Sequence, residues 1–520
     1  MRRRDFMAGS FGTIAAASSA SALSQAVEGS AGDLPELAVD EIPTDPGKIG
    51  FCVKPVVTNL IHTEFWEGPC RWEGTSPEKE KAGAEARFAA LSKRIAGMKL
   101  NDPREVFLDA AHLVYTVGRP DDFFVLPSEE LEKLKPDCQR TDAYYFFPYA
   151  FALSALQVAK QVGKPFIFKG DSRGGDTAAY MNVHGYEAFT PANDEELIEL
   201  ISVLRARKVF RSTKVLFPTD LGSPGANNLG GTMDPEDLEK RLGIDICKIS
   251  FAELVAQMEA VLADKSQTQE AERFAEQLLK NAKKSYIDRK YVVRSVHFYQ
   301  TVRNLMNRHG CNAFTIECFE FCATRLPQRW TITPCLTHSL LRNQQCASSC
   351  EADMGSLLGM RMLMSVANRS CHQGNWHEYP ATVKAGTFHI NHSVPSMKMN
   401  GYDQPDLPYQ LGRFVTQGWG TKVVVDFMNN HDKTVTIARV DPTAHKVLVI
   451  RGELVGAGGW DEDLIGCSVK AVIKPPEGRL DECLRKRAVY GNHQQWVYGD
   501  WTRQMRQLGE TLGLEVDVIS

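Results

Sequence analysis

The residue types best suited to bind a metal ion or move a proton gather late in the sequence, between residues 312 and 395. The segment CASSCEADMG, at 346–355, leads into an apolar stretch with helical spacing. Ser348 or Ser349 can cap that helix, which would place Glu351 in or beside its first turn. A carboxylate there also favours the helix dipole and the exposed N–H groups. Considered alone, Glu351 is therefore better explained by helix capping than by metal binding.

Two histidines further along the chain could join that carboxylate at a metal ion. His392 follows an alternating, strand-like run, where a buried histidine with a structural role is the competing interpretation. His493 stands in the segment GNHQ at 491–494, which we interpret as a turn, and exposed histidines are common in loops. The residues alone leave both interpretations open.

A series of short segments from residue 312 to the end resembles the L-fucose isomerase family and the related L-arabinose isomerases. In order, the segments are NAFTIEC (312–318), TPCLTHSLL (333–341), CEAD (350–353), GNW (374–376), HINHSVP (389–395), VTIAR (435–439) and GNHQ (491–494). The specificity lies in their order and spacing together. Before residue 312 the similarity is limited to the alternation of predicted strands and helices.

The resemblance implies a divalent metal ion, most often Mn²⁺, which orders the oxygens of a small sugar. It implies that Glu351 is the first acidic ligand and His493 the late histidine ligand, with His392 as a further candidate. The family's second acid is an aspartate, and the corresponding stretch here supplies Asn375. An amide can bind a metal through its oxygen, but it cannot take up a proton as a carboxylate does.

The reaction implied is aldose–ketose isomerisation of a deoxyhexose or pentose through a cis-enediol, with flanking carboxylates as general base and acid. Glu351 and Asp353 are the expected catalytic acids, with Glu378 as a substitute. The competing hypothesis, favoured by Asn375, is a non-catalytic carbohydrate-binding relative that keeps the fold and the pocket. Family members commonly form trimers or hexamers, so a homo-oligomer is expected.

Cysteines offer a second metal hypothesis, because Cys318/Cys322 and Cys346/Cys350 share a C-x₃-C spacing. Structural zinc sites more often use C-x₂-C. On a helix, the wider spacing also places two small apolar residues on one face. We therefore do not expect a zinc site.

The elements that must position these residues alternate in type over most of the chain. Short apolar runs and amphipathic helical segments alternate in residues 46–167 and again in 168–379, which predicts parallel sheets covered by helices. Residues 380–520 instead hold β-rich runs with few helices between them, at 423–425, 434–438, 446–450 and 468–473. We predict two Rossmann-like α/β units followed by a C-terminal antiparallel, barrel-like β domain. No G-x-G-x-x-G motif follows a predicted strand and no P-loop motif is present, so a nucleotide-binding site is not predicted.

The first 45 residues read as a twin-arginine export signal and a linker. Arg2-Arg3-Arg4-Asp5-Phe6-Met7 precedes a stretch of small residues, and Ala20-Ser21-Ala22 offers a cleavage site. A frayed basic N-terminus is the competing interpretation. The export signal predicts a periplasmic or otherwise exported protein.

Composition excludes several classes of function. The chain has 520 residues, a net charge of −4, 43% hydrophobic and 24% charged residues, which gives no electrostatic case for nucleic acid. The body of the chain lacks an apolar run of about 18 residues, so no membrane span is expected. The chain has thirteen cysteines, an odd number, and many of them lie within apolar runs of the sequence. Free thiols suit the twin-arginine route, which carries proteins folded in a reducing cytoplasm.

Overall fold

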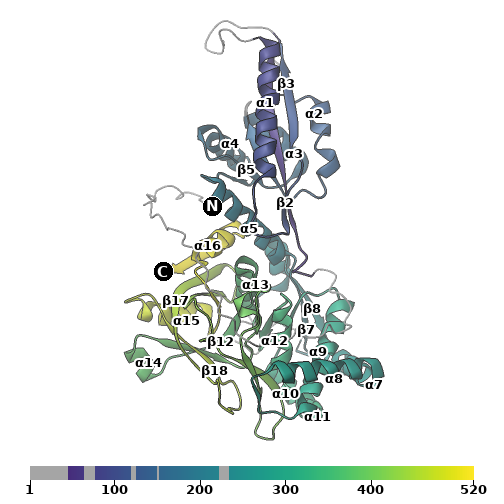
Figure 1. Ribbon diagram of the computed structural model, residues 1–520, viewed down its shortest axis with the longest axis vertical. Coiled ribbons are helices and arrows are strands. Elements are labelled where there is room, and N and C mark those ends of the chain that lie inside the picture. The colour runs from purple at the N-terminus through teal and green to yellow at the C-terminus, as the bar shows by residue number, and fades with distance from the viewer. Residues whose placement is uncertain (1–44, 64–75, 119–124, 149–151, 222–232) are drawn as a thin grey trace.

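The computed structural model shows an α/β unit that projects from a lower body, in which a second α/β unit lies beside a β-barrel (Figure 1). It describes residues 45–63, 76–118, 125–148, 152–221 and 233–520. Nearly all of the predicted export signal and linker lies outside these residues. Within them, no helix is long and apolar enough to cross a membrane.

The first unit is a parallel sheet with the strand order β2-β1-β4-β5-β6, and β3 pairs with the second half of β1. Buried apolar side chains cover both faces, as expected for parallel strands between helices. Its elements are β1 (Phe51–His62), α1 (Pro77–Ala96), β2 (Glu105–Phe107), β3 (Ala111–Val117), α2 (Ser128–Glu132), β4 (Ala143–Pro148), α3 (Ala152–Val162), β5 (Phe166–Phe168), α4 (Ser172–Val183) and β6 (Ala188–Phe189).

Helix α5 (Asp194–Arg211) joins this unit to the rest of the molecule (Figure 1). Leu197 and Leu204 pack with the first unit, whereas Val203 and Phe210 belong to the core around α13 (Met354–Ala367). A helix that is apolar on opposite sides is buried between two layers.

The second unit is a parallel sheet with the order β11-β10-β7-β8. Asp264 both ends α7 and caps α8, so the two helices meet at a single residue. Its elements are β7 (Lys214–Pro218), α6 (Pro235–Leu242), β8 (Asp245–Ile249), α7 (Phe251–Ala263), α8 (Lys265–Asn281), β9 (Lys284–Ser285), α9 (Arg289–Arg308), β10 (Ala313–Ile316), α10 (Cys318–Ala323), α11 (Leu326–Trp330), α12 (Cys335–Asn343), β11 (Ala347–Cys350) and α13.

The C-terminal part is a closed antiparallel barrel, which confirms the predicted fold class. Its strands follow the order β16-β19-β12-β13-β18-β17, and pairing of β16 with β17 closes the ring. Closure leaves no open edge along the ring. The elements of this part, including the smaller β15-β14-β9 sheet, are β12 (His372–His377), α14 (Pro380–Lys384), β13 (Phe388–His392), β14 (Tyr409–Arg413), β15 (Thr421–Val425), β16 (Thr434–Val440), β17 (Lys446–Gly458), β18 (Val469–Lys474), α15 (Leu480–Tyr490), β19 (His493–Tyr498), α16 (Thr502–Thr511) and β20 (Glu515–Ile519).

The boundaries between the sheets lie at different residues from the predicted domain boundaries. Strand β6 extends the first sheet beyond the expected boundary at 167, because it pairs with β5. Strand β12 joins the barrel before the expected boundary at 380, because it pairs with β13 and β19. Both strands are short or polar, so they carry little apolar pattern.

Helix α13 lies directly against the barrel because two glycines face β16. A Cβ added to Gly355 would lie 2.5 Å from the carbonyl oxygen of Val440, and one added to Gly359 would lie 3.1 Å from Cα of Arg439. Such close approach is possible only without a side chain. The contact brings the start of α13, and the turn before it, beside the barrel.

Candidate metal centre

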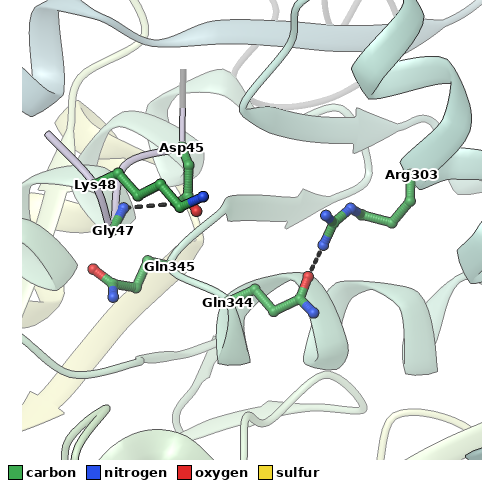
Figure 2. A pocket seen from close by; sticks show the side chains of 6 residues that line it. All are labelled: Asp45, Gly47, Lys48, Arg303, Gln344 and Gln345. Atoms are coloured by element: carbon green, nitrogen blue, oxygen red, sulfur yellow. Dashed lines mark hydrogen bonds between the residues drawn. The ribbon is translucent and has the colours of Figure 1, made fainter. Parts of the chain in front are cut away.

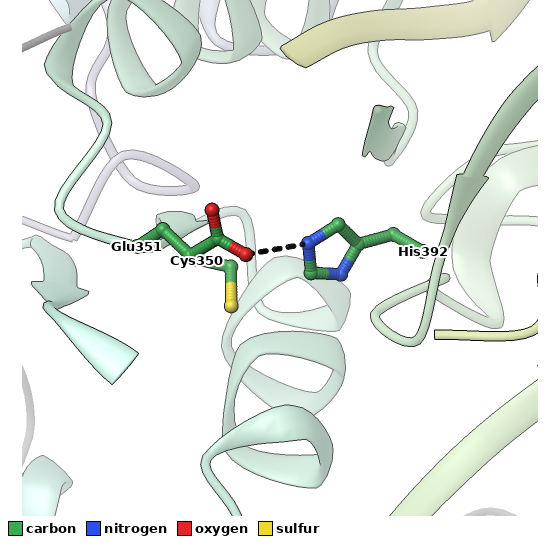
Figure 3. A group of neighbouring side chains, drawn as sticks. All are labelled: Cys350, Glu351 and His392. Carbon is green, nitrogen blue, oxygen red and sulfur yellow. Dashed lines mark ion pairs between the residues drawn. The ribbon is translucent and has the colours of Figure 1, made fainter. Parts of the chain in front are cut away.

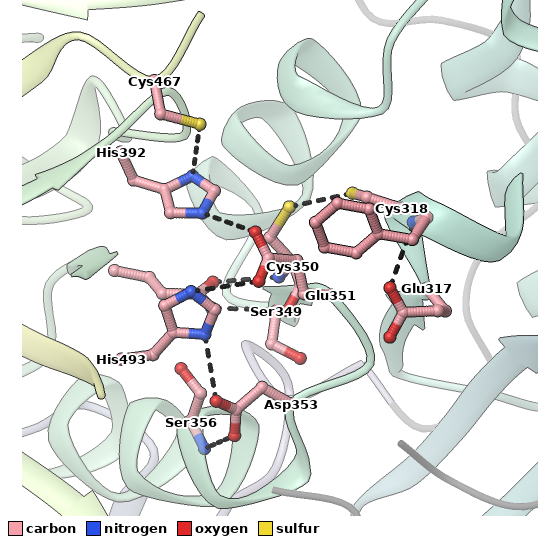
Figure 4. A network of polar contacts seen from close by, with 12 residues as sticks. Glu317, Cys318, Ser349, Cys350, Glu351, Asp353, Ser356, His392, Cys467 and His493 are labelled. Atoms are coloured by element: carbon pink, nitrogen blue, oxygen red, sulfur yellow. Dashed lines mark hydrogen bonds and ion pairs between the residues drawn. The ribbon is translucent and has the colours of Figure 1, made fainter. Parts of the chain in front are cut away.

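The candidate site lies where the carboxyl ends of two neighbouring parallel strands meet the barrel (Figure 4). Strand β10 ends at Ile316 and β11 ends at Cys350, and these two residues are register partners. Glu351 directly follows β11. From the barrel side, His392 ends β13 and His493 begins β19. In open α/β sheets this edge is the usual place for ligands.

A left-handed turn sets the direction of Glu351. Glu351 has φ of 61° and Ala352 φ of 49°, a backbone region that costs residues with a Cβ about 1–2 kcal/mol each. The expected capping by Ser348 or Ser349 is wrong, because both residues lie within β11. Asp353 caps α13 instead, accepting a hydrogen bond from the backbone N–H of Ser356 at 2.9 Å. Glu351 thus points toward the barrel (Figure 3).

Two imidazoles face the Glu351 carboxylate. Its Oε1 lies 3.5 Å from Nε2 of His392, and its Oε2 lies 3.4 Å from Nε2 of His493. Both Nε2 atoms are buried without a hydrogen-bond partner among the described residues. Burial opposes ionisation of Glu351, but the histidines outweigh it and lower the pKa of the carboxyl. Each oxygen of the carboxylate thus lies in ion-pair range of one imidazole.

Asp353 orients His493 from behind. Its Oδ2 lies 3.0 Å from Nδ1 of His493 and 2.9 Å from Nη1 of Arg439. Burial opposes its ionisation, but Arg439 and His493 hold the pKa of Asp353 well below its usual range. A carboxylate accepting from Nδ1 leaves the lone pair on Nε2, the tautomer that a metal ligand needs.

His392 has a sulfur behind it. Its Nδ1 lies 3.8 Å from Sγ of Cys467. Burial opposes charge on this imidazole, but Cys467 and Glu351 outweigh it and raise the pKa of His392 to about 10. The surroundings of Glu351 therefore favour positive charge.

Glu317 is a functional candidate that the sequence interpretation missed. It is 2% exposed and caps α10, its Oε1 accepting from the backbone N–H of Phe319 at 3.1 Å. Its Oε2 is buried without a hydrogen-bond partner among the described residues. Burial, with the charges of Glu351, Glu320 and Asp353, raises the pKa of Glu317 to about 7. The available signal was its place in NAFTIEC, where an acid directly follows an apolar run.

Cysteine sulfurs also reach this site. Sγ of Cys318 lies 3.2 Å from Sγ of Cys350. Cys350, Glu351 and His392 each offer a ligand atom, and these atoms all lie within 4.8 Å of one another (Figure 3). All cysteines in the described part of the chain are free thiols.

Asn375 lies in β12, directly across the sheet from His493. It is the register partner of His493 in β19 and of Asn391 in β13, and it is half-buried. No hydrogen bond joins its side chain to Glu351, His392 or His493 in the parts of the chain described here. Glu378, the substitute acid, instead pairs with Arg487, with Oε1 2.6 Å from Nη2.

A separate cavity of about 350 Å³ lies at the other end of β11 (Figure 2). Gln344 and Gln345 line it with Asp45, Gly47, Lys48 and Arg303. Both glutamines precede β11, whereas Glu351 follows it. This cavity therefore lies away from Glu351, His392 and His493.

Comparison with known proteins does not assign this chain to a family, because no protein-family model and no curated protein matches it. The inference of function depends on the residues themselves. One carboxylate with two buried imidazoles in ion-pair range of it suits a divalent cation, since each donor is of a type that such ions bind.

Proposed function

We propose that this chain is a metal-dependent aldose–ketose isomerase that acts on a deoxyhexose or pentose through a cis-enediol. The observation that carries the proposal is the approach of two buried Nε2 atoms, at 3.5 and 3.4 Å, to the Glu351 carboxylate at a sheet's carboxyl edge. Glu351, His392 and His493 would hold the ion, and oxygen and imidazole donors suit Mn²⁺. A divalent cation there supplies charge stabilisation for the sugar oxygens O1 and O2.

Proton transfer between C1 and C2 is assigned to Glu317. A general acid–base group works best when its pKa is near the operating pH, and burial raises the pKa of Glu317 to about 7. The carboxylate of Asp353 is occupied by Ser356, Arg439 and His493. Asp353 is thus better suited to position His493 than to carry a proton, and Glu317 supplies the acid that Asn375 cannot.

The competing proposal is a carbohydrate-binding relative without turnover. Its support is the amide of Asn375 at the position of an expected acid, together with the full occupation of Asp353. Both proposals require a metal centre, so they differ only in turnover.

The test begins with the metal content of the purified protein, measured by mass spectrometry, followed by an aldose panel assayed for ketose with and without Mn²⁺. Glu351→Gln is expected to lose metal. Glu317→Gln is expected to keep metal and lose about 10²–10⁴-fold in rate. The matched control Glu378→Gln, which breaks an ion pair outside the cluster, should retain both.

The outcomes separate the proposals. Metal without turnover on any sugar would favour the binding protein. Absence of bound metal after reconstitution would refute both.

Export through the twin-arginine pathway and homo-oligomerisation, as a trimer or hexamer, complete the proposal. Free thiols in the described residues are compatible with folding before export. Fractionation of a tagged full-length chain, with Arg2 and Arg3 changed to Lys as a control, tests the first. Mass photometry of the purified protein tests the second.

A further inference from the structure

The fold brings together one cysteine from each of the C-x₃-C pairs seen in the sequence. Cys318 opens α10 and Cys350 ends β11, and their sulfurs lie 3.2 Å apart beside Glu351. Their sequence partners lie elsewhere: Cys322 is exposed, and Cys346 precedes β11 at its opposite end. We infer that Cys350 is a sulfur ligand of the cation site, and that the site therefore selects Zn²⁺ or a similarly thiophilic ion over Mn²⁺. This inference rests on the proposed metal centre.

The left-handed turn explains how consecutive residues can serve one ion. In a regular strand, successive side chains point to opposite faces. Glu351 departs from that alternation with φ of 61°. As a result, the Cys350 sulfur and the Glu351 carboxylate lie within 4.8 Å of each other and of the His392 ligand nitrogen.

Cys350 is held in place at the end of its strand. The residue is 3% exposed, and its backbone N–H donates to Oε1 of Gln373 at 2.9 Å, which fixes the end of the strand. The Cys318 thiol can donate its S–H to the Cys350 sulfur. A donor behind a ligand atom orients it and tunes the site, so Cys318 is assigned as a positioning residue.

The donor set then decides the preferred ion. Without sulfur, one carboxylate and two imidazoles would serve Mn²⁺ well. With Glu351 and His392, a Cys350 thiolate gives Cys-Glu-His, three ligands of the types that Zn²⁺ takes in sites that keep a fourth position open. Soft thiolate ligands favour zinc over manganese.

Cobalt spectroscopy tests the sulfur ligand without an activity assay. The full-length protein is stripped with a chelator and loaded with Co²⁺ alone. The expected result is a thiolate-to-cobalt charge-transfer band in the near ultraviolet, absent in Cys350→Ala and retained in Cys318→Ala. The matched control is Cys483→Ala, since Cys483 is equally buried but lies in α15.

Competition provides the second readout. Dialysis against equal concentrations of Zn²⁺ and Mn²⁺ should load wild type mainly with zinc. The zinc-to-manganese ratio should fall at least about tenfold in Cys350→Ala, since even the loss of an outer partner costs that much affinity.

The failures are distinguishable. Bound Co²⁺ without the sulfur band in wild type would overturn the inference and leave the metal centre intact, and this reading needs no variant that must fold. A band that survives in Cys350→Ala would overturn the assignment of Cys350. Failure to bind Co²⁺, Zn²⁺ and Mn²⁺ would overturn both the inference and the proposed function.

Discussion

In the Glu317→Gln variant, the second α/β unit should become increasingly more stable than in wild type as the pH rises. The pKa of Glu317 is raised from 4.5 to about 7 by burial and by neighbouring carboxylates. A raised carboxyl pKa means that the folded state holds its proton longer than the unfolded chain does. Folding stability is therefore lost as the pH rises from 4.5 to 7. Gln is isosteric and cannot ionise, so the variant is free of this loss.

The size of the effect follows from the pKa. Below pH 4.5 both states are protonated and the carboxyl costs nothing, whereas above pH 7 the full difference applies. At about 1.4 kcal/mol for each pKa unit, the variant should gain about 2–3 kcal/mol on wild type between pH 5 and pH 8. Glu317 is 2% exposed, so solvent screening does little to reduce this figure.

Hydrogen exchange of the chelated protein is the appropriate assay, because a chain with several units need not unfold in one step. Peptides covering β10 and β11 are compared between variant and wild type at each pH, which cancels the intrinsic exchange rate. Glu477→Gln, at an exposed position, is the control and should follow wild type. Equal protection of Glu317→Gln and wild type at pH 5 and pH 8 would refute the assignment of a raised pKa.

Other substitutions test the support behind the ligands. Arg439→Met should cost about 3–5 kcal/mol in denaturant unfolding, because it leaves the buried Asp353 carboxylate without its cation. Asp353→Asn retains a capping residue but no longer fixes the tautomer of His493. Its affinity for metal should fall about 10–100-fold in a titration against a chromophoric chelator. Gly355→Ala should cost about 1–3 kcal/mol in the same unfolding assay, because its Cβ meets the Val440 carbonyl oxygen at 2.5 Å.

The sequence allowed the fold class to be predicted where apolar runs were long enough to show a period. The change from alternating elements to β-rich runs indicates the barrel, and strands β16 and β17 begin where expected. Strands β10 and β11 were missed because each has four residues, and β11 reads Ala-Ser-Ser-Cys. Their polar groups are satisfied across the pair, where Oγ1 of Thr315 donates to the carbonyl oxygen of Ser349 at 2.9 Å. Such pairing between distant segments cannot be recognised from the hydropathy of either segment.

The candidate site divides in the same way. Glu351, His392 and His493 were found through the resemblance, and the structure brings their side chains together. Glu317 was not found, and Cys318 was named only in the C-x₃-C zinc hypothesis that we set aside. The nearness of both residues to Glu351 depends on the register of β10 with β11. Neighbourhood across two parallel strands is a property of the sheet rather than of the local sequence.

The environments of the acids at this site explain why they differ in role. Asp353 has Arg439 against it, so its charge is balanced and its pKa is held low. Glu351 faces two imidazoles, and its pKa is also lowered. Burial and neighbouring carboxylates raise the pKa of Glu317 to about 7, and among the described residues its one hydrogen bond comes from the backbone N–H of Phe319. Acids whose pKa values are pushed apart in one site can take separate tasks. In the proposed function, these environments assign positioning to Asp353, metal binding to Glu351 and proton exchange to Glu317.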